Sequence, residues 1–238
     1  YPILSILRFK RDVGPQSTMA ITATDGDTMT STMNNNKAFR TDACLERLTI
    51  NADTSDARWD LDSFDPDGVS LGVVDGPANT NRIATFLIIQ GGQWEAGSKA
   101  KATGIGNDTY TLTNTSLKPE GVFCFTTRQT ATGITTANAD FCIGMGSRAN
   151  VTRASATNGV GGTTTGETIN TTCDRLHQTD ALIEELTSGT PTETSEGWFD
   201  TASLGSFIID WAVNGGSAAL VAFLAGGSND VLLGQMLI

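Results

Sequence analysis

The sequence predicts an all-β protein of tandem β-sandwich modules, jelly-roll-like in type, that arose by internal duplication. Three observations lead to this fold class. The chain of 238 residues contains 26 glycines, its apolar stretches are short and often alternate with polar residues, and blocks of its sequence recur. Alternation with a period of two is typical of half-buried strands, and glycine-rich breaks about every ten residues indicate turns. Helices sufficient for an α/β sheet are not predicted.

Several segments of the second half are predicted as strands. Residues 110–113 and 122–126 alternate as half-buried strands do. The segments 207–213 and 220–224 are predicted to pair as a hairpin. Their join, residues 214–217, reads Asn-Gly-Gly-Ser, and Asn-Gly and Gly-Gly accept the positive φ of tight turns.

Two further segments have weaker patterns. Residues 158–165 are polar and glycine-rich, which predicts a surface loop. The block 179–186 has apolar residues with charges between them, and a short strand and a short helix both fit it. The side chains predicted to fill the core between sheets are Phe86, Leu87, Ile89, Phe207, Ile209 and Phe223.

An internal repeat organises the chain. The block 41–48 (Thr-Asp-Ala-Cys-Leu-Glu-Arg-Leu) returns as 179–186 (Thr-Asp-Ala-Leu-Ile-Glu-Glu-Leu), a shift of 138 positions (179 minus 41). Three anchors recur at a shift of 135 positions (199 minus 64), namely Phe64 at Phe199, Asp75 at Asp210 and Gly91 at Gly226. Such self-similarity is the mark of a duplicated structural unit.

The repeat divides the chain into three parts. Residues 1–92 form a first sandwich unit that is incomplete at its N-terminal side, and residues 93–227 form a complete second unit. Residues 228–238 correspond to the opening strand of a further repeat, or form a strand-exchange tail. We expect this tail to add to a sheet edge, in its own chain or in a neighbouring subunit, because unpaired edges are templates for another strand.

The charge of the chain restricts its partners. The formal net charge is −11 and the isoelectric point is near 4.4. An acidic surface repels phosphate backbones and anionic lipid, so neither nucleic acid nor a membrane is predicted as a partner. No apolar stretch approaches the about twenty residues of a membrane-spanning helix.

One acidic segment is a candidate calcium site. Four carboxylates, those of Asp60, Asp62, Asp65 and Asp67, lie in nine residues. Calcium binds six to eight oxygens and accepts such acidic loops. A turn at Asp65-Pro66-Asp67-Gly68 that leads into a strand explains the same residues without a metal, because these residue types are those of tight turns. No other metal, and no cofactor, is predicted.

Histidine and cysteine do not form a site in the sequence. His177 is the single histidine and lies in a polar stretch, which predicts a loop residue and no catalyst. The four cysteines, Cys44, Cys124, Cys142 and Cys173, lack the close pairs of a zinc site and are predicted as small buried residues. A disulfide between Cys124 and Cys142, on neighbouring strands, is the open alternative. No catalytic residue is predicted, and the chain is interpreted as a non-enzyme.

Several blocks resemble a repeat of tailed-bacteriophage virion proteins. In that repeat a strand with a Pro and a terminal Phe precedes a Thr-rich segment, as in 117–130 here, and an F-G-F-G strand follows, as in Phe141-Cys142-Ile143-Gly144-Met145-Gly146. The blocks 41–48, 63–71 and 86–92 resemble its later landmarks. The resemblance implies a β-sandwich module of a capsid decoration, head fibre or tail appendage protein, with a virion location. It also implies a homo-oligomer that contacts other virion proteins, and no catalytic residues.

The alternative function is an extracellular carbohydrate-binding or adhesion module. Exposed aromatic side chains at loop tips would then stack on sugar rings, so a glycan remains a possible partner. The candidates are Trp59, Trp94, Trp198 and Trp211. Trp211 lies in an apolar segment and is expected in the core.

Overall fold

The computed structural model confirms the all-β prediction. It describes residues 3–6, 16–22, 36–49, 54–65, 68–76, 92–136, 140–147, 152–160, 173–186 and 193–228. In these ranges all regular elements are strands, and they form four antiparallel sheets. None of the described residues belongs to a helix long and apolar enough to cross a membrane.

The strands before residue 92 are β1 (Ile3–Ile6), β2 (Ser17–Thr22), β3 (Asn36–Arg40), β4 (Leu45–Leu48), β5 (Ser55–Asp65) and β6 (Gly68–Asp75). Those that follow are β7 (Gln93–Ala100), β8 (Gly106–Thr111), β9 (Lys118–Thr126), β10 (Gly133–Thr136), β11 (Phe141–Ser147), β12 (Thr152–Val160), β13 (Cys173–Gln178), β14 (Ile183–Leu186), β15 (Glu193–Ser203), β16 (Ser206–Asn214) and β17 (Leu220–Ser228).

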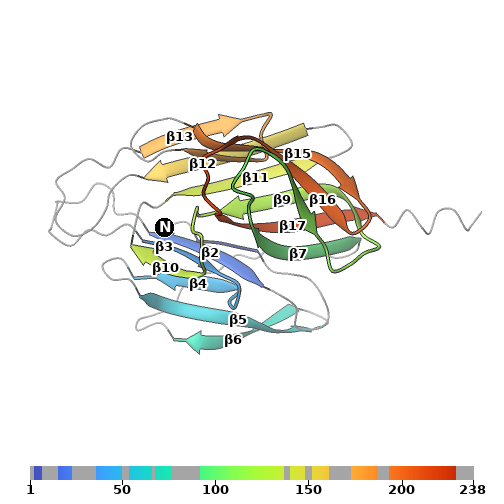
Figure 1. Cartoon of the computed structure of the whole chain (residues 1–238). Coiled ribbons are helices and arrows are strands. Elements are labelled where there is room, and N and C mark those ends of the chain that lie inside the picture. Colours follow the sequence, from blue (N-terminus) through green and yellow to red (C-terminus); the bar gives the residue numbers. More distant parts are fainter. Residues whose placement is uncertain are drawn as a thin grey trace, which may run out of the picture.

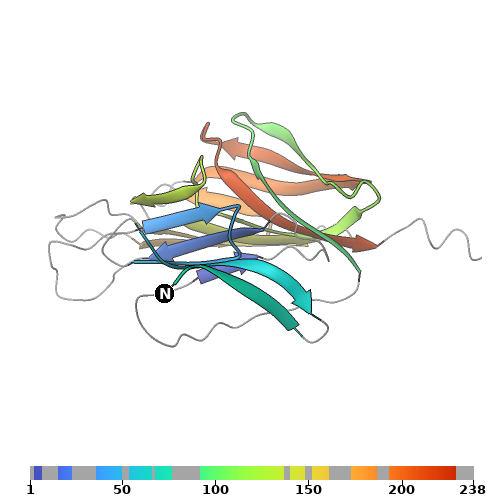
Figure 2. The same cartoon turned by 90° about the horizontal axis from the view of Figure 1, so that it is seen from below.

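The four sheets are stacked face to face. Sheet A has the order β1-β2-β3-β10 and sheet B the order β4-β5-β6. Sheet C has the order β13-β12-β11-β9-β17-β7 and sheet D the order β14-β15-β16-β8. In Figure 1 sheet B lies at the bottom, sheet A above it, and sheets C and D above that; Figure 2 shows β5 and β6 nearest the viewer.

The main core lies between sheets C and D. Phe207 stacks on Tyr110 with ring centroids 4.9 Å apart, and Phe223 meets both rings edge-on. Phe207, Ile209 and Phe223 are buried as predicted. The predicted core residues Phe86, Leu87 and Ile89 lie outside the described residues.

Sheet A contributes side chains to two apolar clusters. On one face Met19 and Phe39 pack against Phe125 and Ala222 of sheet C. The opposite face belongs to a smaller cluster with sheet B, which consists of Ala20, Ala38, Leu48 and Ile134. Sheet A therefore joins the two sequence repeats, with its apolar residues alternating between two cores as the period of a strand requires.

The two repeats share one strand register, and this register corrects the sequence alignment. Leu45 pairs with Trp59 in the first copy, and Ile183 pairs with Gly197 in the second, a shift of 138 (183 minus 45, and 197 minus 59). The same shift relates six of the seven β5–β6 pairs to pairs of β15–β16, and it relates the β1–β2 pairs to pairs in β11–β12.

The shift predicted for the block 41–48 is thus confirmed, and the shift of 135 is wrong. Phe199 corresponds to Leu61, because Leu61 pairs with Leu71 and Phe199 with Ile209. The anchors matched Phe64 with Phe199 and Asp75 with Asp210. Each match is three positions away from the residue that occupies the equivalent place in the fold. Gly91, the third anchor, lies outside the described residues.

The predicted hairpin between 207–213 and 220–224 is also wrong. Strand β16 lies in sheet D between β15 and β8, and β17 lies in sheet C between β9 and β7. The join 214–217 therefore crosses between the two sheets. Gly216 has a φ of 77°, so the glycine does serve a turn. This turn leads the chain across the core, because both strands have apolar faces to bury in it.

The remaining expectations have mixed outcomes. The ambiguous block 179–186 ends in strand β14, and its copy 41–48 ends in β4. The loop predicted for 158–165 is wrong at its start, because β12 continues to Val160. Beyond Ser228, where β17 ends, the predicted tail lies outside the described residues. A strand is nevertheless shared between repeats: β10, in the second repeat, pairs with β3 and completes sheet A.

Candidate functional site

The calcium candidates follow a strand and its turn. Asp60 and Asp62 lie within β5, where Asp60 is half-buried and Asp62 exposed. Asp65 ends β5 and accepts hydrogen bonds from Ser63 Oγ at 3.1 Å and Ser70 Oγ at 2.6 Å. Asp67 lies outside the described residues. Among the side chains that are described, no three His, Cys, Asp or Glu residues form a group that could hold a metal ion.

The tryptophans do not form an exposed aromatic platform. Trp211 is 1% exposed, as expected for the core. Trp59, Trp94 and Trp198 are each half-buried. The Trp198 indole N–H donates to the Glu196 carboxylate at 2.8 Å, so its polar edge is bound within the chain.

Cys44, Cys124 and Cys142 are buried, as predicted. Cys124 and Cys142 occupy the neighbouring strands β9 and β11, but Cys124 pairs with Gly144, and both thiols are free. Cys44 is also free and buried. Burial raises the pKa of Cys142 to about 12, which removes the thiolate that reactive cysteines need. The loop prediction for His177 is wrong, because this residue lies in β13, paired with Ala156.

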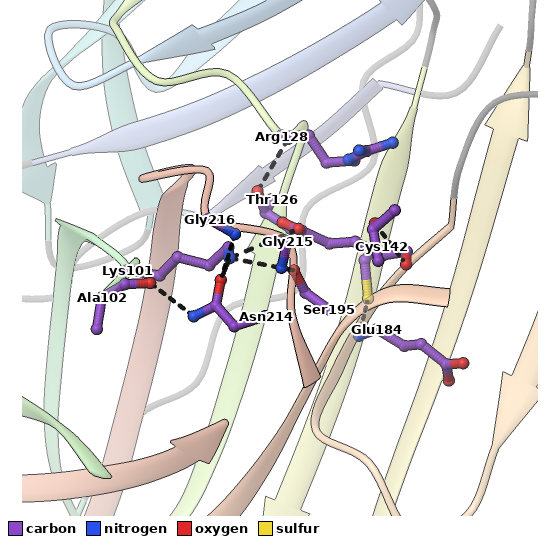
Figure 3. A network of polar contacts seen from close by, with 12 residues as sticks. Lys101, Ala102, Thr126, Arg128, Cys142, Glu184, Ser195, Asn214, Gly215 and Gly216 are labelled. Atoms are coloured by element: carbon purple, nitrogen blue, oxygen red, sulfur yellow. Dashed lines mark hydrogen bonds and ion pairs between the residues drawn. The ribbon is translucent and has the colours of Figure 1, made fainter. Parts of the chain in front are cut away.

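A buried polar cluster centres on Lys101, directly after β7 (Figure 3). The Lys101 side chain is 0% exposed. Its Nζ donates to Asn214 Oδ1 at 2.7 Å and to Ser195 Oγ at 3.1 Å, and it lies 3.9 Å from the Glu185 carboxylate. Nζ also lies 4.9 Å from the centre of the Trp211 ring. Burial lowers the pKa of the Lys101 ammonium, and the nearby Glu185 opposes part of this shift.

The Asn214 carboxamide is held on both sides. Its Nδ2 donates to the backbone oxygens of Ala102 and Gly104, each at 2.8 Å. Its Oδ1 accepts the backbone N–H of Gly216 at 3.2 Å in addition to Lys101 Nζ. These contacts fix the orientation of the amide and attach the join 214–217 to the segment after β7.

A second buried ion network connects the two repeats. Lys37 of β3 pairs with Asp140 at 3.4 Å, and both side chains are at least nine-tenths buried. Arg128 also lies 3.4 Å from Asp140 and donates to the backbone oxygen of Leu186. Burial lowers the pKa of Lys37, and Asp140 opposes the shift. Because a lone buried charge is costly, this pairing favours one arrangement of the repeats.

Among the described residues, the two copies differ at the outer edge of β6. In the second repeat β16 is covered along its edge by β8, which pairs Trp211 with Gly106. Strand β6 is an edge of sheet B, and the described residues supply no strand beside it. By the shift of 138, Val73 occupies the position of Trp211, yet Val73 is 64% exposed and Val74 is 46% exposed.

Sequence reasoning missed both buried ion networks and the covered edge. Lys101, Glu185 and Asn214 are far apart in the chain, and each is ordinary in its local context. The second repeat differs from the first at two of these sites, with Arg47 at the position of Glu185 and Gly76 at that of Asn214. With the correct shift, that difference is the one signal in the sequence that sets these residues apart.

Comparisons of this chain with family models, with curated proteins and with solved structures found no match.

Proposed function

We propose that this chain is a structural protein of a bacteriophage particle, of the capsid decoration, head fibre or tail appendage type, that assembles through its β units. The virion assignment rests on the resemblance of its sequence blocks to a repeat of tailed-phage proteins. The assembly part rests on one observation, the edge of β6, beside which the described part of the chain places no strand.

The edge strand β6 carries exposed apolar side chains, which favour pairing with another strand. Its equivalent in the second repeat, β16, is paired with β8 from Ser206 to Trp211. Val73 and Val74 leave apolar area in water at this edge, whereas Trp211, the equivalent of Val73, is buried. An unpaired edge with apolar residues is a template for β-strand addition. We therefore infer that β6 pairs with a strand of another subunit, which does for the first repeat what β8 does for the second.

The internal architecture also suits a structural role. Sheet A is completed by β10 from the other repeat, and the Lys37–Asp140 pair connects the repeats. These contacts attach the two units to each other. The carbohydrate-binding alternative has less support, because its four candidate indoles are buried or half-buried. Stacking on a sugar ring needs an open aromatic face.

The assembly proposal is tested by the substitution Val73→Asp. A charge on this edge should oppose strand addition, so the variant should sediment as a smaller species than the wild type at the same concentration. Ile105→Asp is the matched control, because Ile105 is 76% exposed and lies outside β6. A wild type that is monomeric at every concentration, or a Val73→Asp variant that assembles fully, would contradict assembly through β6.

The virion assignment needs its own measurement. Mass spectrometry of purified phage particles from the source sample should detect this chain in a constant ratio to the major capsid protein. Its absence from intact particles, together with retention of the isolated protein on a glycan array, would favour the carbohydrate-binding alternative instead.

A further inference from the structure

The cluster around Lys101 brings together the three groups that an amide-forming reaction requires. Lys101 supplies a fully buried amine, and Asn214 a carboxamide whose Oδ1 lies 2.7 Å from Lys101 Nζ. Glu185 places a carboxylate, itself 1% exposed, 3.9 Å from the same Nζ (Figure 3 shows Lys101 and Asn214). We propose that Lys101 and Asn214 condense to an intramolecular isopeptide bond, with Glu185 as the proton carrier.

The surroundings of Lys101 favour the nucleophilic form of its amine. Only a neutral amine attacks a carbonyl carbon, and removal from water destabilises the ammonium. Lys101 is enclosed by the Trp211 ring, Ser195 and Asn214, and none of these carries a charge. The Glu185 carboxyl group lies 3.9 Å from Nζ, so it is the group placed to take the proton.

The surroundings of Asn214 favour attack at its Cγ. The Gly216 backbone N–H donates to Oδ1 at 3.2 Å and is in place to stabilise negative charge on that oxygen, as donors of an oxyanion hole do. The oxygens of Ala102 and Gly104 hold Nδ2 at 2.8 Å each, so the plane of the amide is fixed before reaction. Holding both reactants in place replaces an improbable encounter by a first-order step.

The reaction balances without a further reactant. The Lys101 ammonium gives one proton to Glu185, and the neutral Nζ forms a bond to Cγ of Asn214, whose carbonyl electron pair moves onto Oδ1. Glu185 passes its proton to Nδ2, the carbonyl re-forms, and the Cγ–Nδ2 bond breaks with its electron pair leaving on ammonia. After the new bond has formed, Nζ carries one proton more than a secondary amide has, and this proton passes to Glu185. The products are one secondary amide, one ammonia and a neutral Glu185 carboxyl; nothing is oxidised or reduced.

An ordinary ion pair accounts less well for the cluster. Glu185 Oε1 is buried without a hydrogen-bond partner among the described residues, and the nearest approach of its other oxygen to Nζ is 3.9 Å. A carboxylate that served only to neutralise Lys101 would be expected closer, at about 2.7–2.9 Å.

The first repeat lacks two of the groups, with Arg47 and Gly76 at the equivalent positions, so the bond is specific to the second repeat.

The mass of the full-length folded protein tests the proposal. The wild type should be lighter than its sequence mass by one ammonia, and a proteolytic digest should contain a branched peptide that joins Lys101 to Asn214. Trypsin should fail to cleave after Lys101. Lys101→Arg and Glu185→Gln should both have the full sequence mass, and Lys99→Arg, the matched control two residues away, should cross-link as the wild type does.

Each alternative has a distinct result. Wild-type protein that keeps its full mass after prolonged incubation overturns the proposal, whatever the variants do. Asn214 is followed by Gly215 and can also lose ammonia by closing on its own backbone; a mass deficit that persists in Lys101→Arg would show this and overturn the proposal. Glu185→Gln that cross-links at the wild-type rate would overturn the assigned proton transfer. Circular dichroism of each variant shows whether it has folded.

Discussion

The packing of Phe223 against Gly97 gives the sharpest test of the core. Phe223 lies on β17, between β9 and β7, and is 4% exposed. Its ring meets Tyr110 at 5.8 Å and Phe207 at 5.2 Å, both edge-on. On its own sheet the ring covers Gly97, where an added Cβ would lie 2.5 Å from Phe223 Cζ. The glycine is therefore required by the ring above it.

Removal of the ring should be costly. Truncation of a buried Phe to Ala costs about 3–5 kcal/mol, and two edge-on ring pairs place Phe223→Ala in the upper part, about 4–5 kcal/mol. This is a large part of a typical domain stability of about 5–15 kcal/mol. Urea unfolding followed by tryptophan fluorescence measures it. A loss below about 1 kcal/mol would mean that the site is not packed as described.

The double-mutant cycle with Gly97→Ala isolates the contact. In the wild type, Gly97→Ala should destabilise by about 1–3 kcal/mol through overpacking. In the Phe223→Ala background the added methyl enters vacated space, so the same change should be nearly neutral or stabilising. Gly72→Ala is the matched control, since a Cβ there meets nothing within 4 Å. Equal costs of Gly97→Ala in both backgrounds would refute the packing argument.

Three further predictions concern the thiols, the ion pair and the shared strand. Burial raises the pKa of Cys124 and Cys142, so neither should react with iodoacetamide at about pH 8 in the folded protein; peptide mapping that finds them alkylated as fast as in urea would contradict this. Burial lowers the pKa of Lys37 below its ordinary 10.5, so the native state binds fewer protons than the unfolded state as pH approaches that value. The stability of the wild type relative to Lys37→Met should therefore rise between about pH 7 and about pH 10, and a flat difference in urea titrations counts against the assignment. Ile134→Asp places a carboxylate in the cluster between sheets A and B, so limited proteolysis should cut the first repeat sooner while the second stays intact; unchanged cleavage would mean that β10 does not hold sheet A together.

Local patterns in the sequence predicted strands well where burial alternates. In β8 the buried Tyr110 alternates with exposed neighbours, and in β9 the strand ends at Thr126 as expected. The repeated block at 41–48 and 179–186 was aligned correctly, because it spans a whole bend and strand. The anchors Phe64 and Asp75 were misaligned, because they matched single residue types, whereas the equivalent positions hold Ala202 and Val213.

The sequence by itself determined the all-β class, the duplication and the positions of β8, β9, β16 and β17, because alternation and turn residues act within a few positions of each other. Only the tertiary structure decided which sheet each strand joins. The join at Asn214 has the sequence of a hairpin turn, yet the chain crosses between two sheets there. The Asn214 carboxamide accepts a hydrogen bond from Lys101, 113 positions away. Strand β10 likewise leaves its own repeat to pair with β3. Such choices depend on hydrogen bonds and apolar faces contributed by distant segments, which no local pattern encodes.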